Sequence, residues 1–306
     1  MNLAVIGSGG REHAICYKLK QSKRINKLIC IPGNAGTQKI AENIKEDISN
    51  FSVLYKIIKE REIDIVIVGP EQPLVSGIVD FLKDNNVRVF GPNKFASQLE
   101  GSKAFMKKIC EKKNIPTAKF GIFSKKIEAE SFIDASNTPI VVKADGLAAG
   151  KGVVICKSKD EAKKETKAIL EGKFESSRVV VIEEFLQGEE LSYFVLTDGE
   201  NFKFFGSAQD HKRVGEGDVG PNTGGMGAYS PSPLLTEEIE NKIKNKIIKP
   251  TLVAMKEMGH PYEGILYAGL MIIKDEPFLI EYNIRMGDPE CQACLLYTSP
   301  SPRDRG

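Results

Sequence analysis

Short apolar runs alternate with amphipathic segments along the first third of the chain. Three of these runs have the length and composition of buried strands: residues 3–6, 28–31 and 63–68. Apolar residues at helical spacing predict a helix over residues 52–62, and a further helix and strand are expected at 76–85 and 88–90. Such alternation is typical of a parallel sheet with helices on both faces. The pattern therefore predicts an α/β fold that begins with a doubly wound, Rossmann-like domain over residues 1–102.

A change of pattern predicts a second domain over residues 103–292. It opens with a basic amphipathic helix over residues 103–113, and residues 123–175 fit the order β-α-β-β-α. We expect the region of about residues 121–187 to form a small lid hinged by glycines. The last residues, 293–306, are rich in Pro and Ser and lack a helical period, so we expect them to be disordered.

The lid region contains a loop of small residues, Gly-Leu-Ala-Ala-Gly-Lys-Gly, between two β-branched runs. Gly150 and Gly152 allow backbone N–H groups to approach a ligand closely, and successive N–H groups form an anion-binding concavity. Lys151 in the loop and Lys143 on the preceding strand add two positive charges. A strand follows the loop, so it differs from the phosphate loop that opens a helix. The stretch predicts a polyphosphate site, and the alternative is a mobile glycine hairpin with solvated lysines.

Three loops follow predicted strands of the first domain and are expected to meet at one crevice. The first contains Gly9, Gly10 and Arg11 at the start of a helix, which favours an anion site. The dinucleotide fingerprint needs glycine where this chain has glutamate, so a small phosphate ester is a better candidate than NAD. The second loop carries Asn34, and the third carries Glu71 as a candidate contact to a ribose hydroxyl or an amine. The alternatives are a plain glycine-rich turn and a solvated acid.

An apolar strand expected before Glu183 runs into a short linker that has the groups needed to bind adenine. Adenine requires one hydrogen-bond acceptor, one donor and apolar faces. Glu183 or a nearby carbonyl is the candidate acceptor, the Leu186 N–H is the candidate donor, and Phe185 offers an apolar face. Glu189 or Glu190 is a candidate acceptor for ribose hydroxyls. The alternative is a strand end with solvated acids.

Residues 208–229 form the longest stretch that we expect to be irregular. The stretch mixes carboxylates, basic residues and many glycines, and it includes Asp210, Asn222, Thr223 and Gly224. A long irregular loop in a compact domain is usually functional. We expect this one to bind a ligand that carries both an acid and an amine.

A predicted strand near the end of the second domain carries the metal-binding pattern. Glu281 and Asn283 are two residues apart, so both side chains project from one face of a strand. A carboxylate and an amide oxygen suit Mg²⁺, which keeps its other positions for water and phosphate. Arg285 lies on the same face and is a candidate to offset charge on a transferring phosphoryl group. Lys103, at the positive end of its helix, is a further candidate phosphate ligand.

Composition excludes several classes of protein. The chain has 306 residues with 41% hydrophobic residues, 27% charged residues and a net charge of +2. These values are ordinary for a globular protein and give no reason to expect a nucleic-acid or membrane partner. Four of the six cysteines lie among apolar neighbours, which favours reduced thiols and the cytoplasm. Cys291 and Cys294 have the spacing of a metal or redox pair but lack a second pair, so we do not expect a metal site there.

Seven segments together resemble the phosphoribosylamine–glycine ligase (glycinamide ribonucleotide synthetase) family of ATP-grasp enzymes. They follow the family order: GSGGREHA at 7–14, PGNAGT at 32–37, VGPEQPLVSG at 68–77, LEGSKAF at 99–105, VVKADGLAAGKGVV at 141–154, SAQDHKRVGEGDVGPNTGGMGAYSP at 207–231 and EYNIRMGDPE at 281–290. The resemblance covers residues 1–292, and the segment at 207–231 distinguishes this family from other ATP-grasp enzymes. It implies an ATP-grasp fold in the second domain.

The resemblance also implies a reaction in purine biosynthesis. ATP, glycine and 5-phospho-β-D-ribosylamine give glycinamide ribonucleotide, ADP and phosphate through a glycyl phosphate, with Mg²⁺ or Mn²⁺. It implies nucleotide contacts at Lys103, Lys143, Lys151, Glu183, Leu186 and Glu190, and metal contacts at Glu281 and Asn283. It implies substrate contacts at Gly9, Gly10, Arg11, Asp210, Asn222 and Arg285, to which we add Asn34, Glu71, Thr223, Gly224 and Asp288. Arg285, Lys151 and Asp210 are the expected catalytic residues.

Two departures from the family pattern are visible. Residues 264–273 lack the additional metal-binding acid that many ATP-grasp enzymes carry on this strand. The match stops after Gln292, where the family continues into a C-terminal domain, so we expect a truncated chain with a foreign tail. We expect a monomer. The alternatives are a fragment that binds ATP without turnover and another ATP-grasp ligase that joins a carboxylate to an amine.

Overall fold

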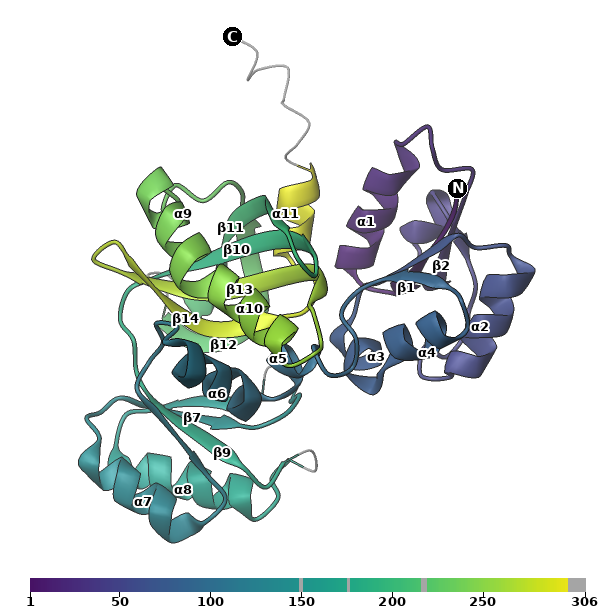
Figure 1. Cartoon of the computed structure of the whole chain (residues 1–306). Helices are drawn as coiled ribbons and strands as arrows, with labels where there is room; N and C mark the ends of the chain where they lie inside the picture. Colours follow the sequence, from purple (N-terminus) through teal and green to yellow (C-terminus); the bar gives the residue numbers. More distant parts are fainter. Residues whose placement is uncertain (149–150, 175–176, 216–218, 297–306) are drawn as a thin grey trace.

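Three sheets organise the chain in the computed structural model, which describes residues 1–148, 151–174, 177–215 and 219–296. In the described residues, one sheet has the strand order β3-β2-β1-β4-β5, a second has β12-β11-β10-β13-β14, and a third has β6-β9-β7-β8. Figure 1 shows the first sheet in the N-terminal body, the second in the central body and the third in the lower one. The predicted α/β class, a doubly wound domain followed by an ATP-grasp-like part with a small lid, is confirmed.

The N-terminal sheet is parallel throughout. Its strands are β1 (Asn2–Gly7), β2 (Lys27–Pro32), β3 (Glu42–Asn43), β4 (Ile65–Val68) and β5 (Arg88–Phe90). Its helical elements are α1 (Gly10–Lys20), η1 (Thr37–Lys39), α2 (Phe51–Glu60), α3 (Glu71–Ser76) and α4 (Ile78–Asp84). Val5 on the central strand pairs with Cys30 on one side and Ile67 on the other, and its side chain is fully buried. Burial on both faces explains the unbroken apolar composition of the strand.

The helix predicted over residues 76–85 differs in the structure. Two short helices, α3 and α4, occupy this region, and Gly77 between them has a left-handed φ of +96°. Glycine adopts this conformation without the steric cost that a side chain brings. Glu71 therefore lies at the start of α3 rather than in a loop.

The lid sheet is antiparallel, with helices packed on one face (Figure 1). It follows the helices α5 (Gln98–Gly101) and α6 (Lys103–Lys113), and its order is β6 (Phe120–Phe123), α7 (Lys126–Ala135), β7 (Ile140–Ala144), β8 (Val153–Cys156), α8 (Lys159–Leu170) and β9 (Val180–Glu184). Ile140, Val142 and Ile182 pack into the core with the two helices. Because side chains alternate along a strand, Lys143 and Glu183 project from the opposite face.

The central sheet is antiparallel and was only partly predicted. Its elements are β10 (Glu189–Asp198), β11 (Phe202–Gly215), β12 (Val219–Tyr229), α9 (Glu237–Ile243), η2 (Lys244–Ile248), α10 (Lys249–Glu257), β13 (Glu263–Ile273), β14 (Glu276–Asn283) and α11 (Glu290–Leu296). The expectation of an irregular loop over residues 208–229 was wrong, because β11 and β12 form a long hairpin there. Such a ladder uses backbone groups, so the glycine-rich edge strand needs no alternation of apolar side chains.

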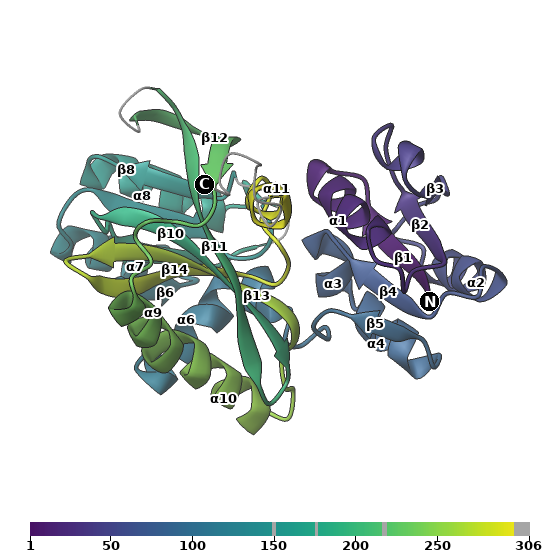
Figure 2. The same cartoon turned by 90° about the horizontal axis from the view of Figure 1, so that it is seen from above.

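The chain end also differs from its prediction. Residues 293–296 continue α11, and Cys294 is buried against the central sheet, so the expected disorder does not begin at residue 293. The rest of the predicted tail lies outside the described residues. α11 packs against α1 of the N-terminal domain (Figure 2). Among the described residues, no helix is long and apolar enough to span a membrane.

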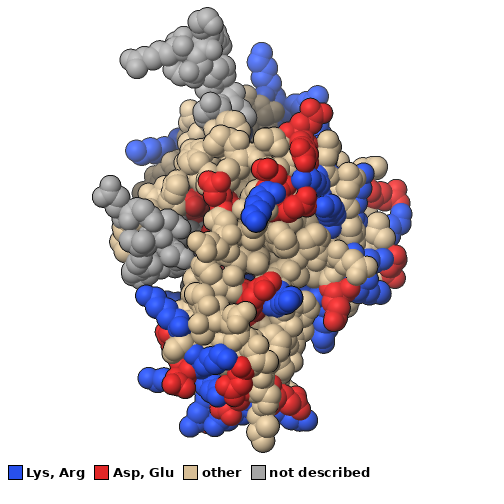
Figure 3. Space-filling view, turned by 90° about the vertical axis from the view of Figure 1, so that its left-hand side faces the viewer, with Lys and Arg blue, Asp and Glu red and all other residues tan. Residues whose placement is uncertain are grey.

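Charges of both signs lie close together on the lid. Lys163 of α8 forms a 2.7 Å ion pair with Asp134 of α7, and Lys125 lies 3.1 Å from Glu128. On the face shown in Figure 3, blue and red side chains are interspersed rather than gathered by sign. This face of the lid therefore presents no strong field of one sign.

Gly264, at the start of β13, allows the linker after β5 to approach closely. Its φ is +130°, and an added Cβ would lie 3.1 Å from the Gly91 Cα atom and 3.2 Å from Pro92. We expect Gly264→Ala to lower the free energy of unfolding by about 2–3 kcal/mol, because backbone strain and a backbone clash add. Gly259→Ala is the control, since Gly259 has a φ of +79° with no atom within 4 Å of an added Cβ. Equal losses in the two variants, measured by urea denaturation, would contradict the close-approach explanation.

Candidate active site

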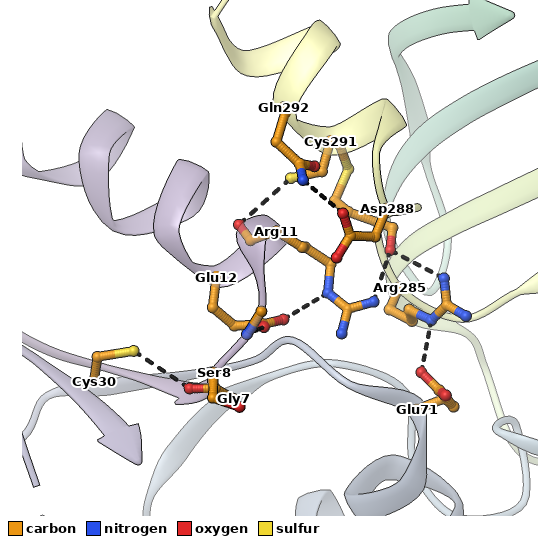
Figure 4. A network of polar contacts seen from close by, with 12 residues as sticks. Gly7, Ser8, Arg11, Glu12, Cys30, Glu71, Arg285, Asp288, Cys291 and Gln292 are labelled. Carbon is orange, nitrogen blue, oxygen red and sulfur yellow. Dashed lines mark hydrogen bonds and ion pairs between the residues drawn. The ribbon is translucent and has the colours of Figure 1, made fainter. Parts of the chain in front are cut away.

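The glycine turn after β1 is closed by the protein's own groups (Figure 4). The Gly9 N–H donates to Glu12 Oε2 at 2.6 Å, and Arg11 Nε donates to Glu12 Oε1 at 2.5 Å. Arg11 is buried, and its Nη1 donates to the Met286 carbonyl at 3.3 Å. Glu12 thus places a negative charge at the N-terminus of α1, where the helix dipole stabilises it. In this structure the expected anion site is occupied by a carboxylate of the chain itself.

The same turn lies against residues that follow β14. A Cβ added at Gly9 would lie 3.4 Å from Asp288 Oδ2, and one added at Gly10 would lie 2.7 Å from Gln292 Nε2. Gln292 Nε2 donates to Asp288 Oδ1 at 2.5 Å. The structure therefore brings the predicted substrate residues Gly9, Gly10, Arg11 and Asp288 together. Close packing between the two domains is a second explanation for glycine at positions 9 and 10.

Asn34 holds the second loop in place. Its side-chain amide donates to the Ser8 and Gly9 carbonyls at 2.8 and 3.1 Å, and its Oδ1 accepts from the Gly36 and Thr37 N–H groups at 2.7 and 2.9 Å. These four contacts join the loop after β2 to the loop after β1. Asn34 therefore fixes the relative position of the two loops through the backbone groups that it binds.

Arg285 joins the two domains at the end of β14. Its Nε lies 3.0 Å from Glu71 Oε2, its Nη2 lies 2.8 Å from Glu100 Oε1, and its Nη1 donates to the Met286 carbonyl at 3.2 Å. Arg11 donates to the same carbonyl oxygen, so both guanidinium groups converge on one backbone group (Figure 4). Glu100 also accepts from the Ile284 N–H at 2.8 Å.

Burial and charge act in opposite directions on these groups. Burial raises the pKa of Glu71, but Arg285, a backbone N–H and Arg11 outweigh it, so the pKa is lowered from 4.5. Glu100 is more deeply buried, and burial raises its pKa from 4.5 despite Arg285 and the Ile284 N–H. Burial lowers the pKa of Arg285, but Glu100 and Glu71 raise it more, so the guanidinium stays charged.

Glu281 and Asn283 lie on one face of β14, as predicted. Asn283 Nδ2 donates to Glu281 Oε1 at 3.4 Å, and Asn283 is buried. Gly269 on β13 lies opposite Glu281 and leaves room for its side chain. In the described part of the chain, no three His, Cys, Asp or Glu side chains form a metal-binding group. A carboxylate with an amide oxygen fits a magnesium ion that takes its remaining ligands from phosphate and water.

Lys103, the first residue of α6, contacts the lid hairpin. Its Nζ donates to the Gly146 carbonyl at 2.9 Å. Burial lowers the pKa of Lys103, and the charges that act on it include Glu281, which raises its pKa, and Lys143, which lowers it. The structure thus brings two predicted phosphate ligands and one predicted metal ligand into one electrostatic environment.

The N-terminus of α6 is capped by the lid rather than left open for phosphate. Asp145 Oδ1 accepts from the Ala104 N–H at 3.1 Å, and Ser102 Oγ donates to Asp145 at 3.1 Å. Ser102 Oγ in turn accepts from the Phe105 N–H at 3.0 Å. In this structure, the phosphate position expected at the helix end is held by the Asp145 carboxylate.

Glu183 binds two lysines instead of presenting a free carboxylate. Its Oε1 lies 3.0 Å from Lys143 Nζ and its Oε2 lies 3.0 Å from Lys107 Nζ. All three side chains are buried. A nearby backbone carbonyl, the alternative considered from the sequence, is therefore the better candidate for the adenine acceptor. The other two candidates, Phe185 and Leu186, follow β9 and are half-buried.

The remaining candidates are distributed over the lid and the long hairpin. Lys151 is exposed and Gly152 is buried, whereas Gly150 lies outside the described residues. Glu190 is exposed near the start of β10. Asp210 is buried on β11, where it pairs with Ala228. Asn222, Thr223 and Gly224 lie on β12, and their side chains are outside the described part.

A small cavity lies between the two domains, next to the contacts of Arg11 and Arg285. Its lining combines both guanidinium groups with backbone and apolar side chains: Arg11, Ile15, Gly69, Phe90, Ile284, Arg285 and Met286 are among its residues. Its volume is about 20 Å³, so in this structure it has room for about one water molecule. The cavity lies between the first and third predicted loops and the end of β14, and no residue of the second loop is part of its lining.

Four residues of this site were not identified from the sequence: Glu12, Glu100, Lys107 and Asp145. Glu12 had a usable signal, because a glutamate three residues after the N-cap is typical of a capping box. Lys107 also had one, since it occupies the buried face of α6 together with Met106 and Cys110. Glu100 and Asp145 had no such signal, because their partners are distant in sequence.

Comparison with known proteins decides the family. Residues 1–100 match the family model "Phosphoribosylglycinamide synthetase, N domain", and residues 101–291 match "Phosphoribosylglycinamide synthetase, ATP-grasp (A) domain". This chain belongs to the phosphoribosylglycinamide synthetase family. It is 52% identical over 297 residues to a phosphoribosylamine–glycine ligase of Mesorhizobium japonicum and 50% identical to one of Brucella melitensis. Each match covers 97% of this chain and 70% of the relative.

Solved structures agree with this assignment to the phosphoribosylglycinamide synthetase family. The phosphoribosylamine–glycine ligase of Thermotoga maritima matches with a TM-score of 0.84 and 35% identity, over 97% of this chain and 72% of that chain. A biotin carboxylase of Campylobacter jejuni matches with a TM-score of 0.74 at 17% identity, over 95% and 67%. The second likeness establishes a shared fold only.

Glu71 provides a pH test of the domain junction. Its pKa is below 4.5 in the folded state, so the ionised carboxylate adds stability above the unfolded pKa, and this is lost as the pH falls through the folded pKa. We expect Glu71→Gln to lower the free energy of unfolding by about 1 kcal/mol at neutral pH, and the difference from wild type to shrink as the pH falls through the folded-state pKa of Glu71, below 4.5. Urea denaturation at neutral and at acidic pH measures this.

Glu60, exposed at the end of α2, supplies the matched control. Glu60→Gln is expected to change the free energy of unfolding little at either pH. A destabilisation by Glu71→Gln that stays constant from neutral to acidic pH would show that the Glu71 charge is not its cause.

Proposed function

We propose that this chain joins glycine to 5-phospho-β-D-ribosylamine and converts ATP to ADP and phosphate. Family membership and the printed names of relatives near 50% identity support the proposal. The observation that carries it is the common electrostatic environment of Lys103, Lys143 and Glu281, beside an arginine-lined cavity at the domain junction. This arrangement offers cations for a triphosphate next to oxygen ligands for a metal.

The chemistry requires positioning more than a side-chain nucleophile. The glycine carboxylate attacks the γ-phosphorus of ATP, and ADP leaves, which gives glycyl phosphate. The amine of phosphoribosylamine then attacks the glycyl carbonyl carbon, phosphate leaves, and the amine loses a proton. Both steps move charge between oxygen atoms, so buried cations that are already in place stabilise them without reorganisation.

The nucleotide is proposed to lie between the lid and the central sheet. Lys103, Lys143 and Lys151 would contact its phosphates, together with the N–H groups around Gly150 and Gly152. Phe185, Leu186 and Glu190 would contact adenosine. Glu281 and Asn283 would hold Mg²⁺ or Mn²⁺, which neutralises charge on the phosphates when bound.

The substrates are proposed to meet at the domain junction. Gly9, Gly10 and Arg11 would face the ribose phosphate, with Asn34, Glu71 and Asp288 around the rest of the molecule. Asp210, Asn222, Thr223, Gly224 and Arg285 would face glycine and the acyl phosphate. Arg11 and Arg285 line the cavity there, and Glu71 contacts Arg285, so a ligand phosphate would compete with carboxylates that now neutralise these cations. The monomeric state and cytoplasmic location stay predictions.

Coupled measurement of ADP tests the proposal. We expect ADP release that requires glycine, phosphoribosylamine and a divalent cation together. Turnover that is unchanged without phosphoribosylamine would contradict it and favour another ligase. Magnesium-dependent ATP binding without any ADP release would favour a chain that binds the nucleotide but does not turn it over.

Glu281→Gln tests the metal position. Loss of the carboxylate is expected to lower kcat/KM for ATP by about 100-fold or more, and to weaken the dependence of ATP affinity on magnesium. Calorimetric titration of ATP at several magnesium concentrations gives the second readout independently of turnover. Glu276→Gln, at the opposite end of β14, is the matched control and should remain near wild type. Equal magnesium dependence in Glu281→Gln and wild type would place the metal elsewhere.

A further inference from the structure

Lys107 is a fully buried lysine between the lid and the central sheet. Its relative exposure is 0%, and its Nζ lies 3.0 Å from Glu183 Oε2. The same Nζ donates to Thr117 Oγ1 at 2.7 Å and lies 5.2 Å from the centre of the Phe120 ring. A buried ammonium group is costly unless it is paired and hydrogen-bonded, and Lys107 has both kinds of contact.

The partner of Lys107 is itself held by a second lysine. Val141 pairs with Glu183 across β7 and β9, and Val181 pairs with Lys143, so Glu183 and Lys143 are diagonal neighbours on one face. Lys143 Nζ lies 3.0 Å from Glu183 Oε1. Each carboxylate oxygen therefore binds one lysine, and the position of Lys107 helps to fix that of Lys143.

The contacts of Lys107 extend to the strand that carries Glu281. Thr117 Oγ1 donates to the Leu279 carbonyl at 2.6 Å, and the Leu279 N–H donates to the Pro116 carbonyl at 2.8 Å. Leu279 lies on β14, two residues before Glu281. A continuous chain of polar contacts thus runs from β14 through Thr117, Lys107 and Glu183 to Lys143.

We infer that Lys107 is a positioning residue for nucleotide binding, which balances the charge of Glu183 and thereby leaves Lys143 available to phosphate. This inference rests on the proposed use of ATP. With Lys107 present, two ammonium groups share one carboxylate, and the cluster keeps one positive charge. Without Lys107, Glu183 neutralises Lys143 completely, and the attraction of Lys143 for a phosphate is lost.

A charge-balancing role of Lys107 predicts a result that a packing role does not. Lys107→Met is expected to raise the dissociation constant for magnesium–ATP about tenfold, because the remaining pair is neutral. The double variant Lys107→Met/Glu183→Gln removes both charges and leaves Lys143 positive. We expect its affinity to return to within about threefold of wild type. Isothermal titration calorimetry measures all three constants, and thermal denaturation checks that each variant is folded.

Lys108→Met is the matched control, since Lys108 is exposed on the same helix and the substitution is the same. Wild-type affinity in Lys107→Met, or a folded double variant that binds at least tenfold more weakly than wild type, would overturn the inference. If Lys107→Met does not fold, the double variant compared with wild type still decides the matter, because it removes the buried Glu183 carboxylate together with the lysine that pairs with it. Failure of the wild-type chain to bind magnesium–ATP would instead reject the proposed function.

Discussion

The junction of the two domains depends on the buried ion pairs of Arg285. Burying a guanidinium group costs several kcal/mol unless the lost hydration is replaced, and here two carboxylates replace it. Glu71 comes from the first domain and Glu100 from the segment that leads into the second. Removing either carboxylate would leave a buried charge only partly compensated. The ion pairs therefore fix where β14 ends relative to the parallel sheet, and with it the shape of the cavity between the two domains.

The same contacts bring together candidate site residues that are widely separated in sequence. Arg11 and Arg285 donate to one carbonyl oxygen, that of Met286, although they belong to different domains. Each guanidinium also has a carboxylate partner, Glu12 or Glu71. Cations that are already paired bind an anion less strongly than free ones, but they are held in position before it arrives. A small phosphate ester would exchange one set of oxygen contacts for another, with little movement of the arginines.

Sequence periodicity predicted the elements well wherever burial creates a repeating pattern. The unbroken apolar strand around Val5 follows directly from burial on both faces of the parallel sheet. Periodicity failed for the β11–β12 hairpin, because an edge ribbon is held by backbone hydrogen bonds and its glycines need no apolar face. Contacts such as that of Glu183 with Lys107 could not be predicted either, because a sequence pattern identifies the buried face of an element and not the partner packed against it.

Residues 100–107 contact three parts of the candidate site within a short length of chain. Glu100 binds Arg285 at the domain junction, Lys103 contacts the lid hairpin at Gly146, and Lys107 binds Glu183. Lys103 and Lys107 are four residues apart on α6, so they point from one face of the helix. A shift of α6 along its axis would therefore displace the contacts to the lid together with those to β14. The helix therefore links the position of the lid to that of β14, and the proposed nucleotide and metal sites lie on these two elements.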